Sequence, residues 1–358
     1  MPVWNLLQRK IILQRFTQTL GTLLQSGVEL KAALARLSTQ VQGHPLEHPF
    51  RFPVDRSFTI KGFGTVVTGT VLAGRLRKED TATQYPRRTP VRVRGLQVHG
   101  QAVEAVEAGQ RAAINLSGVA KEDIQRGDQL AEPDSLLTSF LLNAELKLLA
   151  NAPRELTQRT RIRLHLGTQE VIGRLVLLEE ARFQPGQTQL VQLRLEREVS
   201  SRFGDRFIIR FYSPMETLGG GMVLNPHPRR HKQATMQESL KSLSALEKGT
   251  TEDRLALVIS GKGLAGMEEA EIIGAVAADK QEITTALASL AQKKTVLRVD
   301  NLYVHTSHLG TMEKKVLDLI AGYHKENPLK PGLEKEELKG MLRMRLSPKV
   351  LNMALDGL

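Results

Sequence analysis

Five arginines alternate with apolar residues along four segments whose pattern predicts β-strands. They are Arg161, Arg163, Arg174, Arg194 and Arg210. Because every second side chain of a strand points to the same face, one face of the predicted sheet would be rich in guanidinium groups. Such a face could contact the phosphates of a nucleic acid. It could equally be a solvated outer face of the protein.

The overall charge is strongly positive. Lysine and arginine number 50 against 38 acidic residues, which gives a formal net charge of +12. This excess favours a polyanionic partner, most simply RNA, although a basic protein without such a partner would have the same composition. Aromatic residues make up 4% of the chain, which argues against base stacking as the main binding device.

Residue types that perform other chemistry are missing or badly placed. The absence of cysteine excludes disulfides, thiolate metal sites and cysteine nucleophiles, and it fits a reducing cytoplasm. His44 and His48 are four residues apart, as are His227 and His231, but both pairs lie in proline-containing linkers, so we expect no metal site. No nucleophile stands with a base, so we predict no catalytic residue. No apolar run reaches the about 18 residues of a membrane helix, and we expect no membrane association and a cytoplasmic location.

Residues 46–134 read as an all-β domain. The segment 55–74, DRSFTIKGFGTVVTGTVLAG, alternates apolar and polar residues and is interrupted by glycines. It predicts short strands joined by tight turns, because glycine takes positive φ angles without a Cβ clash. An alternating strand follows at 91–99, and a Gly-Asp turn at 127–128 precedes a closing strand. Many short strands with glycine turns predict a closed barrel.

The rest of the chain divides into a second β unit and a helical part. Residues 135–226 contain the alternating segments that carry the five arginines. Residues 227–234 form a basic linker. Residues 235–308 combine helical segments with an Asp300-Asn301 hairpin, which predicts a winged helix. Residues 309–358 begin the same pattern again, and we predict an incomplete second winged helix.

From residue 46 to the C-terminus these segments resemble the translational GTPases, most closely the bacterial selenocysteine-specific elongation factor. The resemblance implies a multidomain protein with two all-β barrels of translation-factor type, the second and third domains of that family, followed by winged-helix domains. The sequence departs from the family at residues 77–90, RKEDTATQYPRRTP, where we expect an altered or poorly ordered hairpin.

The resemblance also implies a pocket for the aminoacyl group on the first barrel. The matching positions carry Asp55, Arg56, Phe58, Thr68, His99 and Arg111. A selenol is more acidic than a hydroxyl and is an anion at neutral pH, so Arg56 and Arg111 would distinguish selenocysteine from serine. The same arginines beside Asp55 could instead form a surface ion pair. The five arginines of the second barrel would contact the phosphates of the tRNA acceptor or T stem.

The implied function is that of a selenocysteine-specific elongation factor, which binds selenocysteinyl-tRNA for incorporation of selenocysteine at UGA codons. An mRNA hairpin, read by the C-terminal winged helices, and the ribosome would be further partners. The family hydrolyses GTP with magnesium, which requires a phosphate loop of the form G-x-x-x-x-G-K-[ST]. The nearest fragment here, Gly261-Lys262, is followed by glycine and lacks the upstream glycine. We therefore predict a monomeric fragment without the GTPase domain, without a GTP or other cofactor site and without enzymatic activity.

Residues 1–45 have a different pattern, in which apolar residues recur at three- and four-residue spacing around a break at Ser26-Gly27. This predicts an amphipathic helical hairpin. The run LQRFTQTLGTLLQSGVELKAAL resembles the inner-membrane F-type protein of type II secretion and type IV pilus systems. We interpret the segment as foreign to the rest of the chain. Two alternatives remain, a secretion or pilus assembly component based on residues 1–43 and a nucleic-acid-binding protein based on the winged helix.

Overall fold

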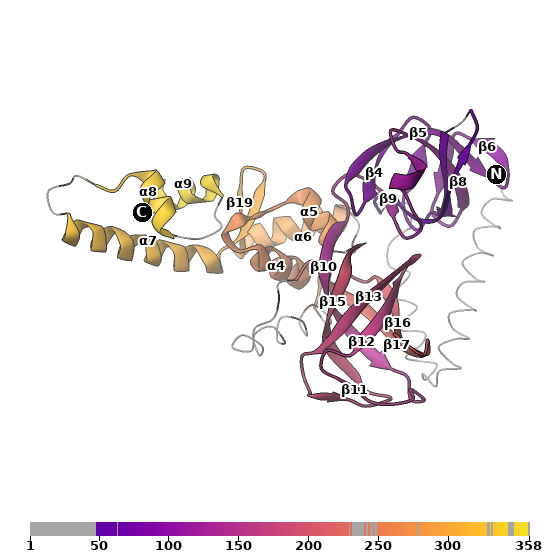
Figure 1. The fold of residues 1–358 in the computed structure, drawn as a ribbon. Coiled ribbons are helices and arrows are strands. Elements are labelled where there is room, and N and C mark those ends of the chain that lie inside the picture. The colour runs from indigo at the N-terminus through magenta and orange to yellow at the C-terminus, as the bar shows by residue number, and fades with distance from the viewer. Residues whose placement is uncertain are drawn as a thin grey trace.

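The computed structural model describes residues 48–230 except 63 and 229, residues 240, 243 and 246, and residues 249–356 except 277, 279, 328, 329, 331 and 343–346. The helical hairpin predicted for residues 1–45 lies outside the described residues, as does part of the linker at 227–234. Two β-barrels lie together at one end of the molecule, and the helical units extend away from them toward the C-terminus (Figure 1).

Six strands close the first barrel in the order β4-β9-β1-β2-β8-β5, because β4 also pairs with β5. These strands are β1 (Arg51–Ile60), β2 (Gly64–Thr70), β4 (Thr81–Tyr85), β5 (Thr89–Val98), β8 (Arg111–Ser117) and β9 (Gln129–Ala131). Strand β6 (Gln101–Val103) extends β5, and β3 (Arg75–Arg77) pairs with β7 (Ala105–Glu107). Buried Phe52, Val67 and Ile114 belong to the apolar core of this barrel, since alternate side chains point inward.

The expectation that residues 77–90 are poorly ordered was wrong. Residues Thr81–Tyr85 form β4, which pairs with β5 on one side and β9 on the other and so closes the barrel. The segment looks too polar for an interior strand. It is stabilised because its backbone groups are paired on both sides and because Ala82 and Tyr85 are buried.

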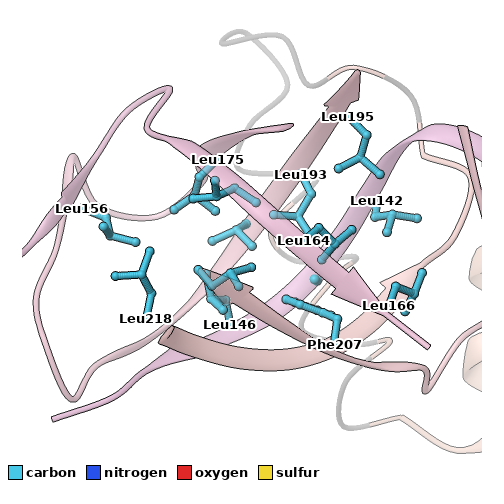
Figure 2. Packing of buried hydrophobic residues seen from close by; sticks show 14 of the residues in the cluster. Leu142, Leu146, Leu156, Leu164, Leu166, Leu175, Leu193, Leu195, Phe207 and Leu218 are labelled. Carbon is cyan, nitrogen blue, oxygen red and sulfur yellow. The ribbon is translucent and has the colours of Figure 1, made fainter. Parts of the chain in front are cut away.

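The second barrel is also closed by six strands, in the order β10-β15-β13-β12-β16-β17. They are β10 (Leu137–Leu148), β12 (Arg161–Leu166), β13 (Gln169–Leu177), β15 (Thr188–Ser201), β16 (Arg206–Phe211) and β17 (Thr217–Asn225). A small sheet of β11 (Leu156–Thr157) and β14 (Arg182–Phe183) lies beside it. Figure 2 shows Leu146, Leu164, Leu175 and Leu193, from four of the strands, meeting in the interior. Because these leucines point inward, the arginines that alternate with them face outward.

A buried ion pair joins the two barrels. The guanidinium of Arg51 in β1 donates two hydrogen bonds to the carboxylate of Asp205, at 2.6 and 2.8 Å. The two side chains are only 6% and 14% exposed. The Nε of Arg51 donates to Gln129 Oε1 at 2.7 Å, and the Gln129 amide donates to the carbonyl of Ser200 at 2.7 Å. This network connects β1 and β9 of one barrel to β15 of the other and holds their relative orientation.

The helical part begins with a winged-helix unit. It consists of α4 (Thr251–Lys262), a 3₁₀ turn (Gly263–Ala265), β18 (Met267–Glu268), α5 (Glu269–Ala275), α6 (Lys280–Gln292), β19 (Val296–Val299) and β20 (Leu302–His305). The predicted Asp300-Asn301 turn is confirmed, because Val299 pairs with Leu302 across it. A second helical unit follows, made of α7 (Ser307–Glu326), α8 (Lys335–Leu342) and α9 (Pro348–Asp356). None of the helices in the described part of the chain is long and apolar enough to span a membrane.

The first winged-helix unit packs directly on the second barrel. The backbone N–H of Phe203 donates to the carbonyl of Ala275 at 3.3 Å, and the guanidinium of Arg254 lies 4.6 Å from the centre of the Phe203 ring. Leu137, at the start of β10, is buried in the core of the winged-helix unit. The winged-helix unit is thus held against the second barrel by these non-covalent contacts as well as by the covalent connection between the two units.

Candidate functional site

An irregularity in β1 positions the first group of predicted site residues. The register with β2 shifts between Val54 and Arg56, which leaves Asp55 as an additional residue in the strand. The Asp55 carboxylate accepts a hydrogen bond from Thr68 Oγ1 at 2.7 Å and another from Arg111 Nη1 at 2.5 Å. Three of the six predicted pocket residues are therefore in direct contact.

Burial and the surrounding donors and charges act in opposite directions on Asp55. Burial opposes ionisation of Asp55, but hydrogen bonds from Arg111 and Thr68 and the positive charges of Arg111 and Arg56 lower its pKa below the usual value. Asp55 is consequently an anion at neutral pH. One carboxylate faces two guanidinium groups, so this part of the surface keeps a net positive charge. The Arg111 side chain is 57% exposed and can be reached from solvent.

The other predicted pocket residues lie nearby on an open surface. Arg56 and Phe58 are exposed on β1, where they share one face because they are two residues apart. His99 lies in the turn between β5 and β6, at a φ angle of 52°. The pairing of Val98 with Ala112 places this turn at the end of β8 where Arg111 is found. Within the described residues we find no hydrogen bond that joins Phe58 or His99 to the Asp55 cluster.

The five arginines of the second barrel lie on its outer side in two rows. Arg174 in β13 is directly opposite Arg161 in β12 and Arg194 in β15. Arg163 in β12 is directly opposite Arg210 in β16. The register of four neighbouring strands therefore brings together arginines that are up to about 50 positions apart in the sequence, as closed-barrel pairing allows.

Several of these arginines have partners that the sequence reasoning missed. Arg161 Nη2 donates to Glu196 at 3.1 Å, and Arg163 Nη1 donates to Glu170 at 2.5 Å. Both guanidinium groups also lie over the ring of Tyr212, at 4.2 and 5.0 Å from its centre. The signal for Glu196 was present in the sequence, since its spacing of two from Arg194 puts it on the same strand face. The contacts of Glu170 and Tyr212 depend on strand register, which no local pattern reveals.

The Gly261-Lys262 fragment singled out in the sequence lies within the first winged-helix unit. Lys262, beside Gly261 at the end of α4, donates from its Nζ to Glu271 Oε1 at 3.0 Å. Its ammonium group is thus engaged within the winged-helix unit. In the part of the chain that the structure describes, no group of three acidic or histidine side chains converges as metal ligands.

Two closed six-stranded barrels followed by a winged-helix region, with arginine clusters on both barrels, define an architecture of the translation elongation factor class. Models of known families match three consecutive parts of the chain. Residues 64–131 match elongation factor Tu domain 2, residues 143–230 match the β-barrel domain of the selenocysteine-specific elongation factor, and residues 317–358 match a winged helix of elongation factor SelB. None of these models covers residues 1–43, and the comparisons give no support to the resemblance to a secretion or pilus protein.

Relatives point to the same family. The chain is 33% identical over 333 residues to the selenocysteine-specific elongation factor of Desulfomicrobium baculatum, covering 92% of this chain and 52% of the relative. It is 31% identical over 303 residues to that of Escherichia coli K12, covering 83% of this chain and 46% of the relative. A solved bacterial selenocysteine-specific elongation factor has the same fold over 92% of this chain and 50% of its own, with a TM-score of 0.69 and 23% identity. Together these findings support the selenocysteine-specific elongation factor family. The chain spans about half the length of the curated relatives it matches.

Proposed function

We propose that this chain is the tRNA-binding part of a selenocysteine-specific elongation factor. The first barrel, in domain 46–134, would hold the aminoacyl group of selenocysteinyl-tRNA, and the second, in domain 135–226, would contact the tRNA backbone. The observation that carries the proposal is the cluster of Arg56 and Arg111 around the single carboxylate of Asp55. An excess of fixed positive charge at this position suits an anionic selenolate and does not suit a neutral serine hydroxyl.

The geometry of Arg111 supports this role. Only Nη1 donates to Asp55, and among the described residues no other partner of the guanidinium is found. The remaining N–H groups can therefore donate to a ligand while the contact with Asp55 holds the side chain in place. Thr68 in β2 donates to the other oxygen of Asp55, so the carboxylate is held from two strands, by Thr68 of β2 and by Arg111 of β8. Arg56, Phe58 and His99 would complete the surface around the amino acid.

Nucleotide chemistry is proposed to reside elsewhere. The resemblance to the translational GTPases implies that complete proteins of this family use GTP and magnesium. The G-x-x-x-x-G-K-[ST] string does not occur in this sequence. We therefore expect no saturable binding of GTP to the purified chain in a titration. Binding with micromolar affinity would contradict the assignment of its domains.

The mRNA hairpin and the ribosome are proposed partners of the C-terminal helical units. The first winged helix is a poor candidate for reading RNA by itself, because Lys280 is the single basic residue in the sequence of α6 (Lys280–Gln292). Its wing ends in the turn Asp300-Asn301, which carries a further acidic group. This disfavours the alternative of a regulator that binds nucleic acid through this winged helix alone.

The proposal is tested by measuring the affinity of the chain for one tRNA that carries either selenocysteine or serine. Using the same tRNA body keeps all phosphate contacts equal, so any difference reports the aminoacyl group. We expect tighter binding of the selenocysteinyl form at neutral pH. Equal affinities for both forms would remove the aminoacyl role of the first barrel, and absence of tRNA binding would remove the proposed function.

A further inference from the structure

The backbone of β1 is held differently before and after Asp55. Residues 51–53 pair with β9, whereas residues 56–60 pair with β2 and, within the described chain, with no other strand. Asp55 is the additional residue of the bulge between these two parts, and a bulge redirects the side chain that it carries. The direction of the Asp55 carboxylate therefore depends on how the backbone is fixed at Val54, the residue before it.

The carbonyl oxygen of Val54 accepts two hydrogen bonds, and one of them comes from the other barrel. The backbone N–H of Gly127 donates to it at 3.0 Å, and Thr168 Oγ1 donates to it at 2.8 Å. Both lone pairs of the carbonyl oxygen are thus used. Because the Val54 carbonyl and the Asp55 N–H lie in one peptide plane, these two donors fix the plane from which Asp55 begins.

Thr168 lies in the turn between β12 and β13, which packs closely on the first barrel. Arg126 Nε donates to the Thr168 carbonyl at 3.4 Å. A Cβ at Gly127 would come within 3.0 Å of the Gln169 side chain, so this turn and the Gly127 turn are in close contact. The Gln169 amide also donates to the carbonyl of Glu198 at 3.1 Å, which ties the turn to β15. The Thr168 hydroxyl is therefore presented to Val54 by a turn that is held on both sides.

We propose that Thr168 is a positioning residue for the aminoacyl site, acting through the Val54 carbonyl on the bulge at Asp55. Its hydroxyl donates to the backbone beside the site and not to a side chain of the site. Asp55 in turn accepts hydrogen bonds from Thr68 and Arg111. The second barrel thereby contributes to the selectivity of the first without touching the amino acid. This inference rests on the proposed function, because it requires that the surface around Asp55 takes the aminoacyl group.

Loss of the Thr168 hydroxyl leaves the Val54 carbonyl with one donor, so the peptide plane before Asp55 can turn. The Asp55 carboxylate is then less well aligned with Thr68 and Arg111. Burial raises the pKa of Asp55, and hydrogen bonds from Arg111 and Thr68, together with nearby positive charge, outweigh it. Weaker hydrogen bonds should therefore raise this pKa toward the usual value of an aspartate. Because Arg111 is also less well oriented, the ratio of the affinities for selenocysteinyl- and seryl-tRNA should fall about two- to tenfold, as for the loss of one hydrogen bond.

The test compares variants of the full chain. Thr168→Val removes the hydroxyl and keeps the shape of the side chain, while Thr168→Ser keeps the hydroxyl. The matched control is Thr65→Val, because Thr65 Oγ1 donates to the carbonyl of Val119 at 2.9 Å within the first barrel. The pKa of Asp55 is measured by NMR with carbon-labelled aspartate, and its signal is assigned with Asp55→Asn. Affinities for one tRNA body that carries either selenocysteine or serine are measured on the same samples. We expect a raised pKa and a reduced affinity ratio in Thr168→Val, and neither change in Thr168→Ser or in the control.

The outcomes separate this inference from the proposed function. If the pKa of Asp55 rises in Thr168→Val but the unaltered chain does not distinguish the two tRNAs, Thr168 does position Asp55 and the proposed function fails. An unchanged pKa of Asp55 overturns the inference, because Thr168 then only holds the two barrels together. An unchanged affinity ratio despite a raised pKa also overturns it, as does a control or a Thr168→Ser variant that behaves like Thr168→Val. If a thermal melt shows that Thr168→Val is unfolded, Thr168→Ala removes the same hydroxyl and takes its place in both measurements.

Discussion

Replacing Asp205 with asparagine should destabilise the junction between the two barrels. In the native protein the carboxylate accepts two hydrogen bonds from Arg51 and a third from the backbone N–H of Arg202. Asparagine retains one oxygen acceptor, but its amide N–H₂ would face the guanidinium and its negative charge is lost. Arg51 would then be left as an uncompensated cation that is only 6% exposed.

Breaking a buried ion pair by removing one partner costs about 3–5 kcal/mol. We expect about 3 kcal/mol for Asp205→Asn, at the lower end, because Asp205 is 14% exposed and asparagine keeps one of the hydrogen bonds. For units of this size, such a loss lowers the midpoint of thermal unfolding by roughly 6–12 °C. Calorimetry on the full chain would measure this shift. It would also show whether the two barrels then unfold in separate transitions.

The matched control is Asp123→Asn. The ion pair between Asp123 and Arg87 has the same separation of 2.6 Å, but its side chains are 55% and 53% exposed. Exposed pairs contribute at most about 1 kcal/mol, so the control should shift the midpoint by no more than roughly 2–4 °C. If the two variants lost equal stability, burial would not be what makes the Arg51–Asp205 pair important, and our reasoning about the junction would be refuted.

Three further predictions follow from individual side chains. Replacing Arg111 with glutamine should reduce the preference for selenocysteinyl- over seryl-tRNA, by at most about 1.5–3 kcal/mol for the loss of one charge-assisted contact. Filter binding of both tRNAs at two salt concentrations would measure the change. Equal losses of affinity for both tRNAs would mean that Arg111 is a general phosphate contact. Because the charges of Arg51 and Arg202 and hydrogen bonds from Arg51 outweigh the burial that opposes ionisation, the pKa of Asp205 is lowered. The stabilisation that ionised Asp205 contributes should be fully present above about pH 4, the pKa of aspartate in the unfolded chain. It should be lost as the pH falls through the lower pKa that Asp205 has in the folded protein. The free energies of unfolding of the native chain and of Asp205→Asn, measured with urea, should therefore become equal in acid. A Cβ at Gly221 would clash with the backbone carbonyl oxygen of Glu145, so Gly221→Ala should cost about 3 kcal/mol. Gly322 on α7 has open space around it, so Gly322→Ala should stabilise the protein by about 0.5–1 kcal/mol, and thermal melts would measure both changes.

The barrel strands and the hairpin at Asp300-Asn301 were predictable because their signals are local. Alternation of isoleucine and leucine with arginine and histidine along β12 identifies both the strand and its outward face, whatever its neighbours are. Strand β4 was missed for the opposite reason. Its segment Thr81–Tyr85 has little apolar alternation of its own, and it is a strand because β5 and β9 supply hydrogen-bond partners on both sides.

The candidate site shows the same division. Its residue types could be proposed from the sequence through resemblance, but whether Arg111 contacts Asp55 could not, because the two are separated by 56 positions and meet only through the pairing of β1, β2 and β8. Equally, Arg159 and Arg230 carry no strand pattern, and they line one surface groove with Arg174 and Arg194 because closure of the second barrel brings their segments together.

The sequence by itself determined the inward and outward faces of the strands, the positive charge of the molecule and the lack of a phosphate loop, since each of these depends on composition or on spacing over a few residues. Tertiary structure alone decided which charges are neutralised. All four arginines lie opposite another arginine, but Arg161 and Arg163 also pair with carboxylates, whereas Arg174 and Arg194 form no ion pair within the described residues, although all four occupy equivalent outward positions in their strands. The physical reason is that the energy of a charge depends on its neighbours in space, and in a closed barrel those neighbours are set by the register between strands.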